Sequence, residues 1–294
     1  MTRYAIGIDG GGTSCRAALA DISGTILGRG KAGAANIMSD PDGAIVNIVA
    51  AARAAFADAG MGPEGLASST AVLGVAGANV GSYGARVQAT LPFARTQVVT
   101  DSLIALAGAL GHEDGVVGAF GTGSVYSARR NGVVREIGGW GFVVGDQASG
   151  ARIGRDLLEL SLLVHDGVRP PTPLTWLVMG QFDNDPQQVV AFAHDAKPKD
   201  FASYAPLVFD HAIQQDDIAV QIVRKAASDI DRTLDALLWP DCRAVCLLGG
   251  LAEAYRSWLS PAHRALLMTP KADALQGAVS FAVTLASEGE RRSA

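Results

Sequence analysis

The sequence contains two glycine-rich stretches, Asp9-Gly10-Gly11-Gly12-Thr13 and Gly121-Thr122-Gly123-Ser124, and each lies between two apolar runs. Apolar runs of this length predict strands, so each stretch closes a β-hairpin. Glycine lets backbone N–H groups point at an anion, and the hydroxyls of Thr13, Thr122 and Ser124 can donate to phosphate oxygens. A single copy would more often be only a tight turn, but two copies in the same context predict two phosphate-binding turns for one nucleotide.

Two common phosphate-binding motifs do not fit this chain. A Walker loop ends in Gly-Lys-Ser/Thr, whereas the only Gly-Lys pair, Gly30-Lys31, is followed by Ala32. The dinucleotide fingerprint needs a third glycine three residues after Gly12, and the chain has Cys15 there. That fingerprint also opens a helix, whereas the run after this turn predicts a strand. The sequence therefore disfavours both motifs.

The two halves of the chain read as an internal repeat. The first hairpin continues through a turn at Asp21 to Gly24 into a third apolar run and then Gly33. The second continues through Asn131-Gly132, a strong hairpin signal, into Val133 to Ile137 and then Gly138-Gly139. The pattern predicts a duplicated three-stranded meander with appended helices. Two such lobes can hold one nucleotide between them.

Composition favours a globular protein that acts on a small molecule. The 294 residues are 49% hydrophobic and 18% charged, which is enough for two domains. A net charge of −5 and a pI near 5.5 argue against nucleic acid or an anionic membrane as the main partner. Asp9 interrupts the N-terminal apolar stretch, so no signal peptide is predicted and we expect a cytoplasmic location.

Cysteine use agrees with that compartment. Cys15, Cys242 and Cys246 are too few for a disulfide framework. The last two have a spacing that a metal site can use, but Cys246 falls in an apolar run that predicts a buried strand. We therefore interpret the pair as core thiols rather than metal ligands.

Periodicity and turn residues predict the remaining elements. Asp101 follows a predicted strand, at the sheet edge where ligands of open α/β sheets gather. Beyond the second meander the chain is mostly helical, with one late strand that ends at Gly249-Gly250. The predicted helices cover residues 41–60, 81–90, 102–110, 149–165, 174–179, 187–194, 204–214, 218–238 and 274–286, and the later strands cover residues 70–75, 96–100 and 243–248.

These motifs, in this order, resemble the sugar kinases of the actin/hexokinase/Hsp70 type. Within that group the chain is similar to the family of bacterial glucosamine and N-acetylglucosamine kinases that also includes the BadF/BadG-type ATPases. The resemblance implies a duplicated ribonuclease-H-like α/β fold with two domains and an interdomain nucleotide cleft. The expected lobes are residues 1–111, joined by a C-terminal helix at about 280–294, and residues 112–279. The motifs that carry the resemblance are 7–13, 35–37, 100–101, 121–124, 139–141, 145–150, 248–250 and 273–278.

The resemblance also implies roles in ATP binding and phosphoryl transfer. Asp101 would be the catalytic base, with a helix N-cap as its alternative role, and Asp9 would hold Mg²⁺ through water rather than serve only as a turn residue. Gly249 and Gly250 would contact adenosine, although they can also be an ordinary strand-to-helix turn. The residues implied to bind the ATP phosphates are Gly11, Gly12, Thr13, Gly121, Thr122, Gly123 and Ser124.

The implied substrate is an amino sugar, and the preferred activity is phosphorylation of glucosamine on its 6-hydroxyl by ATP. N-acetylglucosamine kinase activity is the first alternative. Less favoured are an ATPase that activates a dehydratase and a sugar-responsive regulator, because suitable cluster cysteines and a DNA-binding segment are not recognisable. Relatives imply a homodimer. The residues implied to bind the sugar are Asn36, Asp101, Gly139, Trp140, Gly141, Asp146 and Gln147, with Trp140 alternatively a core residue.

Overall fold

The computed structural model describes residues 4–78 and 81–293, and the chain folds into two compact units. Unit 1 comprises residues 1–113 and 269–294, and unit 2 comprises residues 114–268. The sequence predicts a boundary between residues 111 and 112 and a return of the chain at about residue 280. The return is earlier because Lys271 and Ala272 already donate backbone hydrogen bonds to Ala109 and Gly108.

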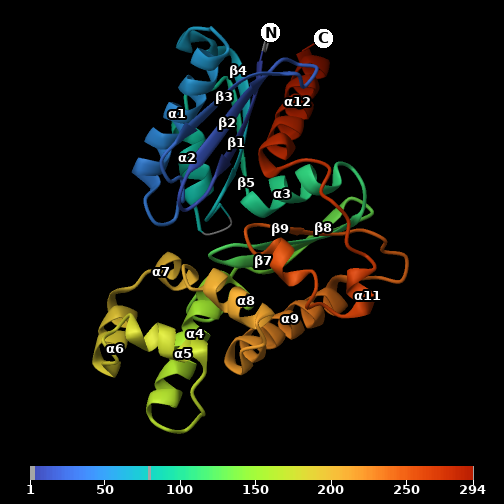
Figure 1. The fold of residues 1–294 in the computed structure, drawn as a ribbon. Helices are drawn as coiled ribbons and strands as arrows, with labels where there is room; N and C mark the ends of the chain where they lie inside the picture. Colours follow the sequence, from blue (N-terminus) through green and yellow to red (C-terminus); the bar gives the residue numbers. More distant parts are fainter. Residues whose placement is uncertain (1–3, 79–80, 294) are drawn as a thin grey trace. The chain divides into compact units, whose positions relative to one another are not determined.

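Unit 1 is built on a five-stranded sheet in the order β3-β2-β1-β4-β5. An antiparallel meander pairs β1 with β2 and β2 with β3, and β4 and β5 run parallel to β1. Helices α1 and α2 lie on one face of this sheet, and α3 and α12 lie on the other (Figure 1). Its elements are β1 (Tyr4–Gly10), β2 (Cys15–Ala20), β3 (Ile26–Ala32), α1 (Pro41–Asp58), η1 (Pro63–Ser68), β4 (Ser69–Val75), α2 (Tyr83–Thr90), β5 (Arg95–Val99), α3 (Asp101–Leu110) and α12 (Ala274–Ser293).

Strand β1 shows how side-chain alternation sets the two faces of the sheet. Ile6 and Ile8 belong to the core under α1, whereas the small residues Ala5 and Gly7 face α12. A Cβ atom at Gly7 would lie 2.4 Å from the backbone nitrogen of Val279, so α12 packs directly on the strand backbone. The small residues of β1 therefore fix how closely the last helix approaches the sheet.

Unit 2 repeats the meander around a four-stranded sheet in the order β8-β7-β6-β9. Strands β6, β7 and β8 are antiparallel neighbours and β9 runs parallel to β6, as β4 does to β1. In place of a fifth strand, Leu267 forms a single parallel bridge with Val245. Its elements are β6 (Gly115–Phe120), β7 (Ser124–Arg130), β8 (Val133–Gly138), α4 (Gly150–His165), α5 (Pro173–Gly180), α6 (Pro186–Asp195), α7 (Pro198–Ala202), α8 (Ala205–Ile213), α9 (Asp217–Leu237), β9 (Val245–Leu248), α10 (Ala252–Tyr255) and α11 (Pro261–Arg264).

The predicted repeat is confirmed by this topology, and most predicted elements lie within a few residues of the observed ones. Cys246 lies in β9, and all three cysteines are buried. Helices α7, α10 and α11 were not predicted, because helices of five residues or fewer carry no readable periodicity. Helix α12 extends to Ser293, beyond the predicted end at Ala286, through a polar stretch with no apolar pattern.

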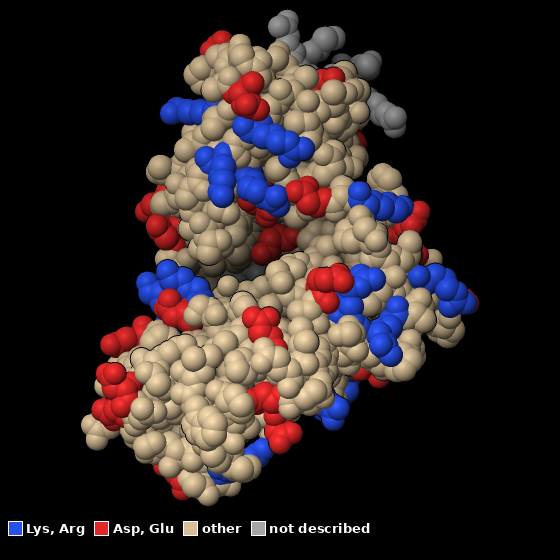
Figure 2. All heavy atoms as spheres, in the orientation of Figure 1, with Lys and Arg blue, Asp and Glu red and all other residues tan. Residues whose placement is uncertain are grey.

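Among residues 4–78 and 81–293, no helix combines the length and the apolar character that a membrane span requires. On the face shown in Figure 2, basic side chains lie in small groups beside acidic ones, without a continuous basic patch among the described residues.

Candidate active site

The first glycine turn connects β1 to β2 and is closed by its own backbone. The amide of Gly11 donates to the carbonyl of Ser14 at 3.0 Å, and the Gly11 carbonyl accepts from Ala35 at 2.9 Å. Gly12 and Thr13 are exposed. The Gly11 amide is therefore used to shape the turn, and Gly12 and Thr13 present the groups best placed for a phosphate.

Asp9 lies in β1 beside this turn and is paired with Arg16 of β2. The Arg16 guanidinium donates to Oδ2 of Asp9 at 2.6 and 3.2 Å, and its Nη1 is 2.9 Å from Oδ2 of Asp273. Partial burial lowers the pKa of Arg16, but hydrogen bonding and the charges of Asp9 and Asp273 outweigh it and raise that pKa. Burial, followed by the Asp9 charge, raises the pKa of the adjacent Cys15 thiol to about 12. Arg16 therefore fixes one oxygen of Asp9 and leaves Oδ1 to accept further bonds.

Asp101 is the first residue of α3, which follows β5 after the single residue Thr100. The helix N-cap is Thr100, whose Oγ1 accepts from the Leu103 amide at 3.3 Å, so the capping alternative for Asp101 is wrong. Oδ1 of Asp101 accepts from the Ser102 amide at 2.9 Å. Because β1, β4 and β5 are parallel, Asp101 lies at the same sheet edge as the first glycine turn.

Asn36 also belongs to this edge of unit 1. Its side-chain oxygen accepts from the amides of Met38 and Ser39 at 3.0 and 3.2 Å. The following residue, Ile37, donates its amide to the carbonyl of Ala76, just beyond β4. The side-chain oxygen thus shapes a local turn, and the side-chain amide nitrogen is the group that suits a sugar hydroxyl.

The second glycine turn connects β6 to β7 and, like the first, is closed by a backbone hydrogen bond of its own. The Gly121 amide donates to the Gly123 carbonyl at 3.0 Å, and Ser124 Oγ donates to the Gln147 carbonyl at 2.7 Å. Ser124 is 6% exposed, whereas Gly121 and Thr122 are exposed. The Ser124 hydroxyl, predicted to bind phosphate, therefore donates within the protein and braces the loop that contains Gln147.

Asp146 lies against this turn. A Cβ atom at Gly123 would be 2.8 Å from Oδ2 of Asp146, whose Oδ1 accepts from the Gly141 amide at 3.1 Å. Burial raises the pKa of Asp146, although hydrogen bonds from the backbone of Gly141 and Ser124 and the charge of Arg152 act to lower it. The carboxyl group of Asp146 thus lies next to the second glycine turn, and Asp146 is only 8% exposed.

The neighbouring positions of the same loop face solvent. Trp140 is 77% exposed, so its alternative role as a core residue is wrong. Gly139 and Gly141, on either side of it, have φ of +71° and +85°, a backbone conformation that favours glycine. Gln147 is exposed as well. The loop therefore presents an indole and an amide to the exterior of unit 2.

Gly249 and Gly250 follow β9 and lie beside the second turn. Gly249 has φ +90°, and a Cβ atom there would be 2.2 Å from the carbonyl oxygen of Phe120, the last residue of β6. A Cβ atom at Gly250 would meet nothing within 4 Å. Leu251 donates its amide to the same Phe120 carbonyl at 3.2 Å. Gly249 is thus required for packing, and Gly250 leaves its backbone open to a ligand.

Each unit therefore gathers its own set of predicted residues. Unit 1 places Asp9, the first glycine turn, Asn36 and Asp101 at one sheet edge, and unit 2 brings together the second glycine turn, residues 139–147 and Gly249-Gly250. Sequence reasoning assigned no role to Arg16, Asp273 or Tyr255. The hairpin register, which places position 16 opposite position 9, is the signal that could have found Arg16.

The two related sheets, each with a glycine turn after its first strand, define the class: a duplicated, ribonuclease-H-like two-domain α/β protein of the kind that binds nucleotides. The BadF/BadG/BcrA/BcrD ATPase family matches residues 6–282, and the chain belongs to this family.

Individual relatives match nearly the whole chain. The glucosamine kinase GspK of Vibrio cholerae is 37% identical over 280 residues, which cover 95% of each chain. An N-acetyl-D-glucosamine kinase of Dictyostelium discoideum is 33% identical over 144 residues, 47% of this chain and 45% of that one. A solved structure from Chromobacterium violaceum, of a protein assigned as an N-acetylglucosamine kinase, superposes with a TM-score of 0.87 at 35% identity and covers 95% of this chain and 99% of that chain.

Proposed function

We propose that this protein is an amino-sugar kinase that transfers the γ-phosphoryl group of ATP to the 6-hydroxyl of glucosamine. The observation that carries the proposal is the presence in both units of a glycine turn after the first strand, together with Asp101 at the carboxyl edge of the first sheet. Membership of an ATPase family supports ATP as the donor. Similarity to the Vibrio cholerae glucosamine kinase over 95% of both chains supports the acceptor.

In the proposed reaction, Asp101 accepts the proton of the sugar 6-hydroxyl while that oxygen attacks the γ-phosphorus of ATP. The bond from the γ-phosphorus to the bridging oxygen breaks, and ADP leaves with the electron pair. Backbone amides and hydroxyls at Gly12-Thr13 and at Thr122-Gly123 would stabilise the charge on the phosphate oxygens. Such positioning and preorganised donors supply most of the rate in phosphoryl transfer.

Asp9 fits a magnesium site of the kind that phosphates and water complete. Arg16 bonds only Oδ2 of Asp9, so Oδ1 can accept from a metal-bound water. Within residues 4–78 and 81–293, no three His, Cys, Asp or Glu side chains cluster as a metal site. Magnesium commonly keeps several waters and binds through one or two carboxylates and substrate phosphates. When bound, Mg²⁺ would neutralise charge on the ATP phosphates.

Asp146 is proposed to recognise the protonated amine of glucosamine, and its neutral isostere tests this. In Asp146→Asn we expect KM for glucosamine to rise about tenfold or more, with less change for N-acetylglucosamine, because only the free amine carries a positive charge. Asparagine tolerates the φ of +54° at this position, so the variant should fold. Initial rates with both sugars measure the effect.

Asp166→Asn, at the exposed C-terminal end of α4, is the matched control and should leave both KM values unchanged. An equal rise in KM for both sugars in Asp146→Asn would contradict recognition of the amine.

N-acetylglucosamine kinase activity remains the second candidate, favoured by the Dictyostelium relative. ADP release with glucosamine, N-acetylglucosamine, glucose or no sugar, each with and without Mg²⁺, separates the two. The proposal expects Mg²⁺-dependent turnover that is fastest with glucosamine. Faster turnover with N-acetylglucosamine would show that N-acetylglucosamine is the preferred acceptor. ADP release that does not depend on sugar would show that the protein is an ATPase rather than a sugar kinase.

A homodimer is also proposed, through an apolar groove of about 570 Å³ on unit 2 between α4 and α6. Val143 and Val190, which line this groove, are 80% and 58% exposed. Arg155 and Glu159, one turn apart on α4, also line it, so a two-fold contact can place Arg155 of each copy opposite Glu159 of the other. The expected location of such a dimer is the cytoplasm, where ATP is available.

Reversing one charge tests that interface. Arg155→Glu should give monomers in light scattering, and adding Glu159→Arg should restore dimers. Monomeric wild-type protein, or dimers in both variants, would contradict it.

A further inference from the structure

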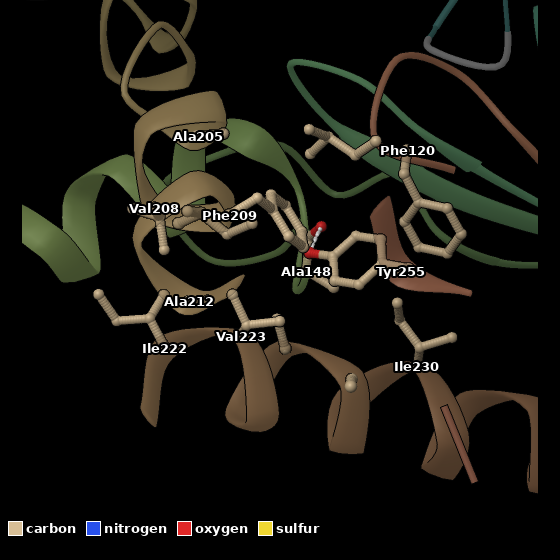
Figure 3. Packing of buried hydrophobic residues seen from close by; sticks show 14 of the residues in the cluster. Phe120, Ala148, Ala205, Val208, Phe209, Ala212, Ile222, Val223, Ile230 and Tyr255 are labelled. Carbon is tan, nitrogen blue, oxygen red and sulfur yellow. Dashed lines mark hydrogen bonds between the residues drawn. The ribbon is translucent and has the colours of Figure 1, made fainter. Parts of the chain in front are cut away.

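Tyr255 is a buried tyrosine whose hydroxyl reaches the loop that contains Asp146 and Gln147. It is 0% exposed, and its Oη donates to the carbonyl of Ala148 at 2.6 Å (Figure 3). Its ring packs edge-on against Phe120 and Phe209, with centroids 5.4 and 5.1 Å away. The ring is therefore fixed by aromatic packing, which gives the hydroxyl a defined position.

The backbone that this hydroxyl holds is unusual. Ala148 has φ +63° and Asp146 has φ +54°, and Gln147 lies between them. Alanine rarely adopts such a conformation, because its Cβ atom crowds the backbone, so surrounding contacts must maintain it. A cavity of about 40 Å³ adjoins Gln147 and Ala148 and is large enough for water. Gln147 and Ala148 are therefore not closely packed on the side that faces this cavity.

Other hydrogen bonds fasten the same segment to the second glycine turn. Gly150 and Ala151 donate their amides to the carbonyls of Gly121 and Thr122 at 2.8 and 3.2 Å, and Ser124 Oγ donates to Gln147. Tyr255 is the last residue of α10, which comes after Gly249-Gly250 in the chain. Its hydrogen bond to Ala148 therefore connects this segment to a second part of unit 2. Residues 146–149 are therefore held from both the phosphate turn and the segment proposed to contact adenosine.

We infer that Tyr255 is a positioning residue for the sugar: by holding the Ala148 carbonyl, its hydroxyl keeps Asp146 and Gln147 oriented toward the substrate. The inference rests on the proposed function. Because Tyr255 is 0% exposed, it acts only through the backbone that it fixes. Its loss should weaken sugar binding while leaving the phosphate-binding groups in place.

Tyr255→Phe removes only the hydroxyl and tests this role. We expect KM for glucosamine to rise about five- to tenfold, because the loss of one buried hydrogen bond changes an equilibrium by about that factor. We expect kcat and KM for ATP to stay within about twofold of wild type. Hydrogen exchange at the amides of Ser149, Gly150 and Ala151 should accelerate by a similar factor. Thermal unfolding checks that the variant folds.

Tyr126→Phe is the matched control, because Tyr126 also packs edge-on against Phe120 but its hydroxyl makes no bond to this loop. It should change neither KM nor exchange at these amides. Adding Ala148→Gly should restore most of the loss in Tyr255→Phe, because glycine adopts φ +63° without strain.

An unchanged rate of hydrogen exchange at residues 149–151 in Tyr255→Phe would overturn the inference. A fall in kcat and a rise in KM for ATP that are as large as the rise in KM for glucosamine would also overturn it. Wild-type protein that turns over no amino sugar would instead overturn the proposed function. The exchange comparison does not depend on turnover, so it still decides whether Tyr255 holds the loop.

Discussion

Asp101→Asn should lower kcat by about a thousandfold while leaving ATP affinity within about twofold of wild type. Asparagine keeps the size and the acceptor oxygen that meets the Ser102 amide but cannot accept the proton of the sugar hydroxyl. The groups proposed to bind ATP are other residues, the two glycine turns and Gly249-Gly250. Steady-state ADP release gives kcat, and titration with a non-hydrolysable ATP analogue gives the affinity.

Thr100→Ala is the structural control for that experiment. Thr100 caps α3, so its loss should cost about 1 kcal/mol of unfolding free energy and leave the carboxylate of Asp101 in place. Asp101→Asn should show the opposite pattern, a large loss of kcat with unchanged stability. An Asp101→Asn enzyme with more than a tenth of wild-type kcat would exclude Asp101 as the base.

Gly249→Ala should destabilise unit 2 by about 2–5 kcal/mol and raise KM for ATP strongly. The new Cβ atom would lie 2.2 Å from the Phe120 carbonyl oxygen, and the φ of +90° is unfavourable for alanine. Relief of the clash must move either the end of β6 or the segment after β9, and the second glycine turn begins at the next residue, Gly121. Denaturant unfolding and ATP-dependent rates measure the two effects.

Gly250→Ala is the matched control one position away. Nothing lies within 4 Å of a Cβ atom at Gly250, and its φ is not in the left-handed region, so stability should stay within about 0.5 kcal/mol. If Gly250 contacts adenosine, KM for ATP should still rise. Equal stability of the two variants would contradict the packing role assigned to Gly249.

The duplicated meander was predictable because each hairpin carries its own local signals. Glycine turns, the Asn131-Gly132 pair and apolar runs of strand length determine strand order within each meander. The return of the chain at residue 269 was not predictable, because it depends on hydrogen bonds from Lys271 and Ala272 to α3, far away in sequence. Helices α7, α10 and α11 are too short to produce a periodic pattern.

The sequence predicts which residues form the candidate site. It does not predict which of their hydrogen-bond donors and acceptors remain available to a ligand. The amides of Gly11 and Gly121 close their own turns, and the Ser124 hydroxyl braces the Gln147 backbone. A glycine motif predicts a turn but does not say which amides its internal hydrogen bonds consume. Tyr255 gave no signal, because its partner Ala148 is 107 residues away in sequence.

The most direct test of the proposed kinase activity is the stoichiometry and identity of the product. Purified protein is incubated with ATP, Mg²⁺ and glucosamine, ADP is quantified, and the sugar is analysed by mass spectrometry and phosphorus NMR. The proposal predicts one glucosamine 6-phosphate for each ADP formed. ADP without a phosphorylated sugar, a phosphate on another hydroxyl, or no turnover with any amino sugar would contradict it.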